Sequence, residues 1–116
     1  MITRLYTGED RESHFEQLTP LFQKADRGFD RAPLETAKAV VFNRAPVGHF
    51  LDWHPAPRRQ YVISLRGQIE IGLGDGTALR FGPGEVFLAE DLTGRGHTFR
   101  VVGDEPCLFA TVPLAG

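Results

Sequence analysis

The chain has 116 residues, of which 41% are hydrophobic and 24% charged, and its formal net charge is -2. This length and composition are typical of one globular domain with a single core. Without a basic excess there is no electrostatic attraction for a nucleic acid or an anionic membrane surface, so we expect neither partner. No apolar run approaches the roughly 20 residues of a membrane span, and the polar N-terminus lacks the apolar region of a signal peptide. We therefore expect a cytoplasmic protein.

The first 36 residues are predicted to form an N-terminal extension that packs on the main domain or on a partner subunit. Residues 13–22 (SHFEQLTPLF) fit either an amphipathic helix or a strand, and Pro20 would shorten both. We favour an extended segment. The residues that follow, up to Thr36, read as a polar connector anchored by Phe22 and Phe29.

Residues 37–116 read as short apolar segments separated by Gly and Pro, which is the pattern of an all-β sandwich or barrel. Eight strands are predicted: Ala37–Asn43, Val47–His54, Gln60–Arg66, Gln68–Gly72, Ala78–Phe81, Glu85–Ala89, His97–Val102 and Pro106–Val112. The sequence Gly74-Asp75-Gly76 predicts a hairpin, because Asp-Gly suits a tight turn whose central residues need positive φ. The expected fold is a single-domain jelly-roll β-barrel with an N-terminal extension.

Five residues between positions 48 and 67, a stretch that contains the third predicted strand, have a distinctive spacing. Gly48, His54, Ala56, Gln60 and Gly67 are separated by five, one, three and six residues. This spacing resembles the first motif of the cupin superfamily, G-x5-H-x-H-x3-E-x6-G. Two ligand positions of that motif are changed here, because Ala56 stands in place of its second His and Gln60 in place of its Glu.

A second group resembles the other cupin motif, G-x5-P-x-G-x2-H-x3-N. Gly76 is followed after five residues by Gly82, Pro83 and Gly84, with Gly82 in place of the motif's Pro. The His of this motif arrives late, as His97. The resemblance to the cupins covers roughly residues 37–112 and implies a small β-barrel that places site residues inside it.

The resemblance further implies a divalent-metal site, for Fe, Ni, Zn or Mn, held by His54, Gln60 and His97. Imidazole and oxygen ligands suit such metals. Gln60 offers an oxygen without charge, so water or a substrate oxygen would have to complete the coordination. The alternative is that the two imidazoles are only hydrogen-bonded in a polar barrel mouth and hold no metal.

Side chains alternate along a strand, so Asp52 and His54 are expected on one face of their strand and His49 on the other. We therefore expect His49 at the surface. Asp52 is a candidate ligand-binding residue or a carboxylate that orients an imidazole. Arg59 is a candidate for attracting an anionic ligand. Asp91, in the loop before His97, either caps its own turn or contacts a ligand.

Three functions remain open from the sequence. The first is a divalent-metal-dependent enzyme of the dioxygenase, isomerase or lyase type, which the cupin resemblance suggests, acting on a small polar molecule in the barrel mouth. The second is a non-catalytic ligand-binding or sensory protein with an altered metal site. The third is a structural homodimer with an incidental cavity. A homodimer is also expected, because Trp53, Tyr61, Ile63 and Leu65 alternate away from the expected pocket and need cover.

Overall fold

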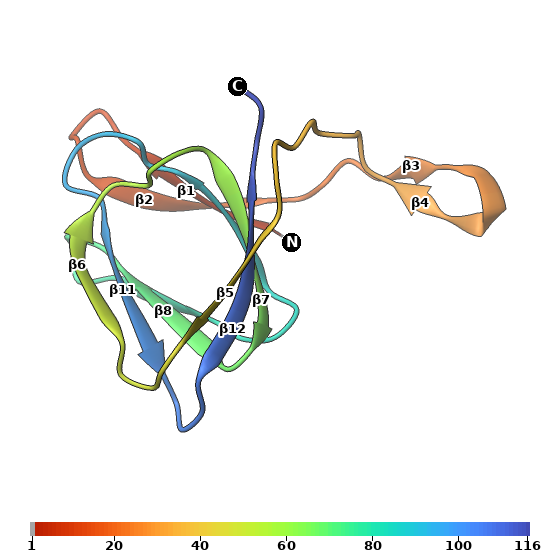
Figure 1. Ribbon diagram of the computed structural model, residues 1–116. Coiled ribbons are helices and arrows are strands. Elements are labelled where there is room, and N and C mark those ends of the chain that lie inside the picture. Colours follow the sequence, from red (N-terminus) through yellow and green to blue (C-terminus); the bar gives the residue numbers. More distant parts are fainter. Residues whose placement is uncertain (1) are drawn as a thin grey trace.

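The computed structural model describes residues 2–116 and consists almost entirely of β-strands (Figure 1). Its strands are β1 (Ile2–Thr7), β2 (Ser13–Leu18), β3 (Gln23–Lys24), β4 (Asp30–Arg31), β5 (Val41–Ala45), β6 (Phe50–His54), β7 (Gln60–Arg66), β8 (Gln68–Gly72), β9 (Ala78–Phe81), β10 (Val86–Glu90), β11 (His97–Val102) and β12 (Cys107–Pro113). A single 3-10 turn, Asp26–Gly28, joins β3 to β4. Among these described residues, no helix has the length and apolar character needed to span a membrane.

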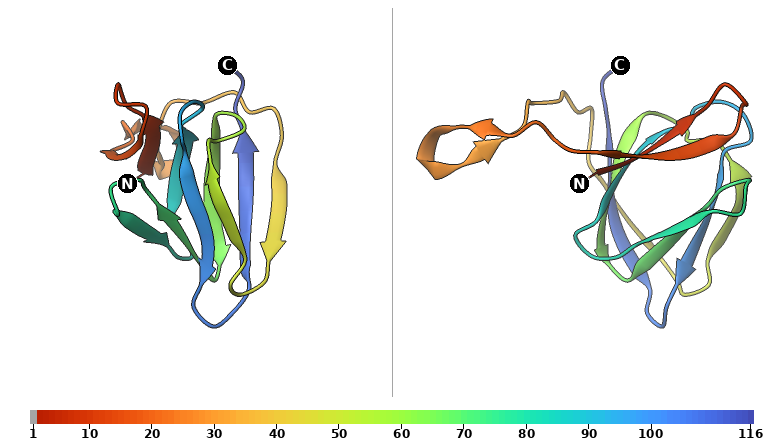
Figure 2. Two further views of the ribbon diagram at one scale, coloured as in Figure 1. Left: turned by 90° about the vertical axis from the view of Figure 1, so that its left-hand side faces the viewer. Right: turned by 180° about the vertical axis from the view of Figure 1, so that it is seen from behind.

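Two sheets face each other and enclose the core (Figure 2). The larger sheet has the strand order β2-β1-β10-β7-β12-β5, and the smaller has the order β6-β11-β8-β9. Neighbours in the smaller sheet pair antiparallel, and in the larger sheet only β1 and β10 run parallel. This arrangement confirms the predicted all-β jelly-roll barrel.

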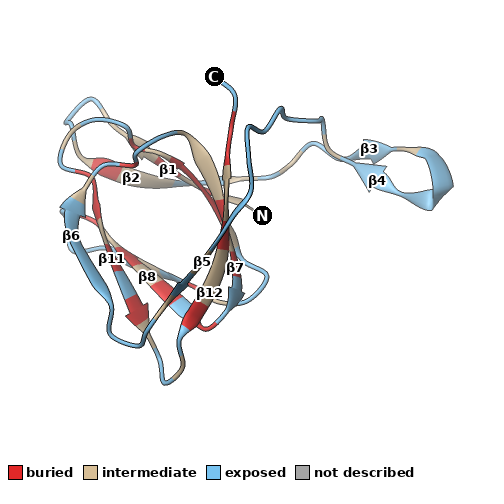
Figure 3. Cartoon of the chain, in the orientation of Figure 1, coloured by how far each residue is buried: buried red, intermediate tan, exposed pale blue. Residues whose placement is uncertain are grey.

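The core lies between the sheets because inward residues alternate with outward ones along each strand. In β8, Ile69 and Ile71 are fully buried, whereas Gln68 at the start of the strand is exposed and Glu70 is half-buried. They pack with Leu5, Phe81, Phe87 and Val101, which come from both sheets. Buried segments therefore appear in the barrel strands and not in the hairpin that projects from it (Figure 3).

Four of the eight predicted strands have the predicted bounds, namely β7, β8, β9 and β11. The other four are present with shifted ends. The largest shifts are at β5, which begins at Val41, and at β6, which begins at Phe50. The amide of His49 donates to the carbonyl of Pro46, and this turn delays the start of β6. The hairpin predicted at Gly74–Gly76 joins β8 and β9, which pair antiparallel, and Gly76 has φ +89°.

The N-terminal residues divide into two parts. Residues 2–18 form β1 and β2, which extend the larger sheet beyond β10, so the segment beginning at Ser13 is a strand. Residues 20–34, which we name the arm, leave the barrel as the short β3–β4 hairpin (Figures 1 and 2). Strands β1 and β2 therefore belong to the larger barrel sheet, although the sequence predicted an extension separate from the barrel up to residue 36.

Candidate functional site

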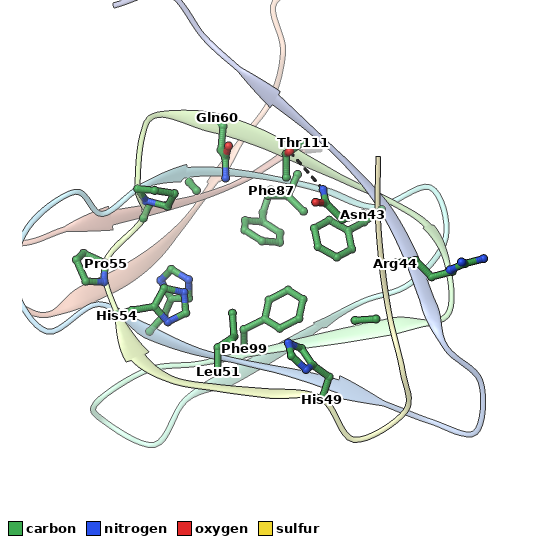
Figure 4. Close-up of a pocket in the computed structure, with 17 residues that line it drawn as sticks. Asn43, Arg44, His49, Leu51, His54, Pro55, Gln60, Phe87, Phe99 and Thr111 are labelled. Atoms are coloured by element: carbon green, nitrogen blue, oxygen red, sulfur yellow. Dashed lines mark hydrogen bonds between the residues drawn. The ribbon is translucent and has the colours of Figure 1, made fainter. Parts of the chain in front are cut away.

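A cavity of about 480 Å³ lies inside the barrel, between β5 and β6. These are the edge strands of the two sheets, and they do not hydrogen-bond to each other. Figure 4 shows the side chains that surround the cavity, with Phe87 and Phe99 near its centre and polar residues around them. A volume of this size is typical of small-molecule binding sites.

A β-bulge in β6 decides which of its side chains face the cavity. His54 pairs with His97 and Leu51 pairs with Phe99, so Asp52 and Trp53 together oppose a single residue of β11. Such an extra residue reverses the alternation of side chains along the strand. Leu51 and His54 therefore both line the cavity, and so does His49. His49 is exposed, as expected, but it lines the cavity and does not lie on the opposite face, because simple alternation does not hold across the bulge.

His54 and His97 form a pair at one end of the cavity. Their ring centroids are 4.7 Å apart and the rings are tilted by 55°. Nδ1 of His54 donates to the backbone carbonyl of Asp52 at 2.7 Å. Nδ1 of His97 lies 2.6 Å from Oδ2 of Asp91 and donates to it. Because both Nδ1 atoms carry the proton in these bonds, Nε2 is the nitrogen that each ring has left for a bound molecule.

Asp91, which does not line the cavity itself, fixes the orientation of His97 through its contact with Nδ1. Its side chain is fully buried, and Oδ2 also accepts a hydrogen bond of 2.6 Å from the hydroxyl of Ser13. Oδ1 is buried without a hydrogen-bond partner among the described residues. A buried carboxyl group in this position sets the tautomer of the imidazole that it contacts and stabilises the ring when it takes up a proton.

Two loops meet closely behind the pair of imidazoles. The amide of Ala56 donates to the backbone carbonyl of Asp91 at 2.9 Å. Gly96 has φ +80°, and a Cβ at this position would overlap the backbone of His54. Only glycine combines this conformation with so close an approach. The glycine-rich sequence before His97 therefore brings His97 beside His54.

The remainder of the cavity is largely apolar. Leu51, Val62, Phe87, Phe99 and Phe109 line it. A second polar region lies away from the imidazole pair, where the side-chain amide of Asn43 donates weakly to the hydroxyl of Thr111 at 3.4 Å (Figure 4). The guanidinium group of Arg44 points away from the centre of the cavity in the same view.

The three residues expected to hold a divalent metal, His54, Gln60 and His97, all line the cavity. Gln60 lines the cavity, but Figure 4 shows it entering from β7, on a different side from His54. Within residues 2–116, no three His, Cys, Asp or Glu side chains are close enough to share a metal ion. Protein metal sites for the expected metals commonly have at least three such ligands. The two imidazoles alone therefore do not fit a protein-held metal.

The other candidate residues lie outside the cavity lining. The carboxyl of Asp52 accepts from the amide of Trp53 at 2.9 Å in the bulge. Arg59 donates to Glu90 at 2.5 Å and contacts Glu35 at 3.5 Å. Burial raises the pKa of Glu90, but the hydrogen bonds from Arg59 and Arg4 outweigh it and leave the pKa below its ordinary value.

Sequence reasoning missed two kinds of residue. Ser13 contacts Asp91 across 78 positions of sequence, and no local motif marks that pairing. Asn43, Phe109 and Thr111 line the cavity from β5 and β12, which are neighbouring strands. Their inward alternation was a usable signal, but the facing strand could not be identified without the topology.

The fold and site can be compared with known proteins. No protein-family model and no curated protein sequence matches the chain. Among solved structures, an uncharacterised conserved protein with a double-stranded β-helix domain from Klebsiella pneumoniae is 27% identical over 72% of each chain, with a TM-score of 0.55. An RmlC-like cupin family protein from Methanocaldococcus jannaschii is 11% identical, over 85% of this chain and 93% of that one, with a TM-score of 0.54.

A third similar structure is the enzyme dTDP-6-deoxy-D-glucose-3,5-epimerase RmlC from Legionella pneumophila, solved in complex with dTDP-4-keto-L-rhamnose. It is 15% identical, over 98% of this chain and 72% of that one, with a TM-score of 0.53. These likenesses agree with the resemblance found in the motif spacing. The chain has the double-stranded β-helix fold that these structures share. A shared fold does not by itself fix an activity.

Proposed function

We propose that the protein binds a small organic molecule that has an apolar body and an oxygen-bearing head. The observation that carries this proposal is the pair His54 and His97 at one end of a largely apolar cavity of about 480 Å³. A pocket with an apolar lining and a few converging polar groups is the usual form of a specific small-molecule site. The ligand is thus less polar than the sequence suggested.

The head group contacts Nε2 of the two imidazoles. A neutral imidazole accepts a hydrogen bond there from a hydroxyl or an acid, and a protonated one donates to a carboxylate. The hydrogen bonds of Nδ1 to Asp52 and Asp91 keep both rings oriented for either contact. This mode of binding needs no metal held by the protein's own side chains.

A proton-transfer enzyme is the second candidate, and the contact between Asp91 and His97 favours it. Nε2 of His97 would take a proton from an acidic O–H or C–H group of the bound molecule. The Asp91 carboxyl group would stabilise the imidazolium ion that results. Incubation of the protein with 2-acetylnaphthalene in D₂O separates the two functions. Only a proton-transfer enzyme would speed the exchange of the ketone's methyl protons for deuterium. That effect would be lost in His97→Phe.

Calorimetric titration with 2-naphthoate tests the binding function. A ligand of this size bound at about -0.3 kcal/mol per heavy atom would have a dissociation constant of about 1 mM or tighter. Binding should be weakened at least tenfold in His97→Phe. The neutral amide 2-naphthamide tests the role of charge, because it keeps the apolar body and changes only the head.

A matched pair of variants tests whether the cavity is the site. Leu51 lines the cavity and Leu65 does not, although the two side chains are almost equally exposed, at 42% and 43%. Leu51→Trp should abolish binding by filling the mouth, and Leu65→Trp should leave it unchanged. Equal effects of the two substitutions would show that naphthoate binds elsewhere.

A further inference from the structure

Asn43 and Thr111, which we name the distal pair, form a second polar group in the cavity, on the inner face of the larger sheet. Asn43 of β5 lies opposite Phe109 of β12, and Thr111 is two residues further along β12. The two polar side chains are therefore diagonal neighbours on one face of the sheet. Both are half-buried and both line the cavity. Figure 4 shows the distal pair on the other side of the cavity from His54.

The distal pair has only weak hydrogen bonds of its own. The side-chain amide of Asn43 donates to the carbonyl of Val41 and to the hydroxyl of Thr111, both at 3.4 Å, whereas ordinary bonds of this kind are about 2.9–3.0 Å long. Within residues 2–116, the structure shows no donor to Oδ1 of Asn43 and no acceptor for the hydroxyl of Thr111. Asparagine is disfavoured in strands, and polar groups removed from water normally have partners. The distal pair therefore keeps one acceptor and one donor for a bound molecule.

The chemistry of the distal pair favours a neutral hydroxyl group. A hydroxyl donates one hydrogen bond, which Oδ1 of Asn43 accepts, and accepts another, which the hydroxyl of Thr111 donates. A carboxylate would place an anion against Oδ1, and the guanidinium group of the neighbouring Arg44 points away from the centre of the cavity (Figure 4). The distal pair thus differs from the imidazole pair, which contacts either a neutral or an anionic head.

The centre of the cavity is aromatic. Phe99 of β11 and Phe109 of β12 contact each other from the two sheets, with ring centroids 5.6 Å apart and the rings tilted by 47°. Phe87 also lies near the centre (Figure 4). Aromatic rings prefer tilted and offset contacts, so a planar ring system packs well against this lining. The cavity as a whole therefore suits a molecule that is polar at both ends and aromatic between them.

We propose that the molecule bound in the cavity is a hydroxylated aromatic acid. Its acid group contacts the imidazole pair, and its hydroxyl group, at the opposite end of the ring system, contacts Asn43 and Thr111. This inference rests on the proposed binding function and adds a second point of recognition to it. Asn43 and Thr111 are then specificity-determining residues, because a molecule without the hydroxyl group leaves both of them unpaired in the occupied site.

Calorimetric titration with 2-naphthoate and its hydroxylated derivatives tests this assignment. The 5-hydroxy, 6-hydroxy and 7-hydroxy derivatives carry the hydroxyl group at three positions of the ring that lacks the acid group. At least one of them should bind the wild-type protein about fivefold or more tighter than 2-naphthoate does, which is the gain expected from two neutral hydrogen bonds.

Three variants assign this gain to side chains. Asn43→Leu and Thr111→Val keep the approximate size of each side chain and remove its polar atoms, so in each variant the hydroxy acid should lose its advantage over 2-naphthoate. Thr98→Val is the matched control, because Thr98 is also a half-buried threonine on a strand with a neighbour on each side but does not line the cavity. It should keep the wild-type ratio of affinities. Thr111→Val decides the assignment if Asn43→Leu, on an edge strand, does not fold.

The possible outcomes separate this inference from the binding function on which it rests. If 2-naphthoate binds in the cavity and no hydroxy acid binds more tightly, the inference is overturned and the binding function stands. If neither 2-naphthoate nor any hydroxy acid binds, both are overturned. A gain that persists in Asn43→Leu and in Thr111→Val would mean that the hydroxyl group contacts another polar side chain of the cavity, such as Gln60 or His49, and would also overturn the inference.

Discussion

The buried carboxyl group of Asp91 accepts hydrogen bonds from His97 and from Ser13 at the same oxygen, Oδ2, each at 2.6 Å. This contact joins the N-terminal strand β2 to the loop before β11 and to the cavity wall. A segment that the sequence placed outside the barrel domain therefore takes part in orienting a side chain of the site.

The first prediction concerns this contact. Asp91→Asn removes the charged acceptor that both donors use, so the free energy of unfolding should fall by about 1.5–3 kcal/mol. Ser13→Ala removes only one of the two bonds and should cost about 1 kcal/mol. Urea unfolding measures both changes. Asp52→Asn is the control at an exposed site and should stay within about 0.5 kcal/mol of wild type; an equally large loss there would contradict the special role of Asp91.

The second prediction concerns pH and Glu90. This side chain accepts hydrogen bonds from Arg4 and Arg59, and its pKa is lowered in the folded protein. A lowered pKa means that the stabilisation is present above the ordinary pKa of a glutamate and is lost as the pH falls through the folded value. Glu90→Gln should therefore lose about 1–3 kcal/mol at pH 7, and its difference from wild type should shrink in acid.

Unfolding measured between pH 7 and pH 3 follows this difference. Glu16→Gln serves as the control, because Glu16 also pairs with Arg4 but is about half exposed. An exposed ion pair contributes little, so this variant should lie within about 1 kcal/mol of wild type at each pH. A gap between Glu90→Gln and wild type that widens in acid would contradict the assignment.

The third prediction compares two glycines of similar φ. Gly84 has φ +86° with open space around it, so Gly84→Ala should cost about 1–3 kcal/mol from backbone strain alone. At Gly96 the added Cβ would also overlap the carbonyl of His54, and the backbone must move. Gly96→Ala should therefore lose more stability than Gly84→Ala and should weaken naphthoate binding. Equal melting temperatures of Gly84→Ala and Gly96→Ala would show that the loop containing Gly96 does not lie against the backbone of His54.

The fourth prediction concerns metal binding. Wild type lacks three converging metal-ligating side chains among its described residues, so Ni, Zn and Mn should bind weakly. Ala56 lines the cavity with His54, and Ala56→His adds a third imidazole at that position. This variant should gain roughly tenfold to a hundredfold in affinity by calorimetry. Adding His97→Ala should abolish the gain; if the gain persists, His97 is not a neighbour of the new imidazole.

The sequence predicted the barrel strands well because each is short, apolar and bounded by glycine or proline. The β7, β8, β9 and β11 bounds follow directly from that pattern. The pairing of β1 with β10 was out of reach, because residues 2–7 and 86–90 are distant in sequence and nothing local specifies a parallel partner.

The site was only partly predictable. The motif spacing singled out His54 and His97, and the structure brings their ring centroids to 4.7 Å from each other. The bulge at Asp52 and Trp53 was not predictable from alternation, so His49 was placed on the wrong face. The distance between Gln60 and the imidazole pair also depends on how the loop at residues 55–59 turns, which spacing alone does not define.

The central claim is that Nε2 of His54 and of His97 meets the bound molecule while Nδ1 remains bonded to the protein. Long-range ¹H–¹⁵N NMR spectra of the histidine rings, recorded during titration with 2-naphthoate, report on each nitrogen separately. The account predicts Nδ1–H tautomers in the free protein, and on binding a shift of the Nε2 signals of both rings that is larger than any shift of Nδ1. Rings that start as Nε2–H tautomers, or that show no change at saturating naphthoate, would contradict it.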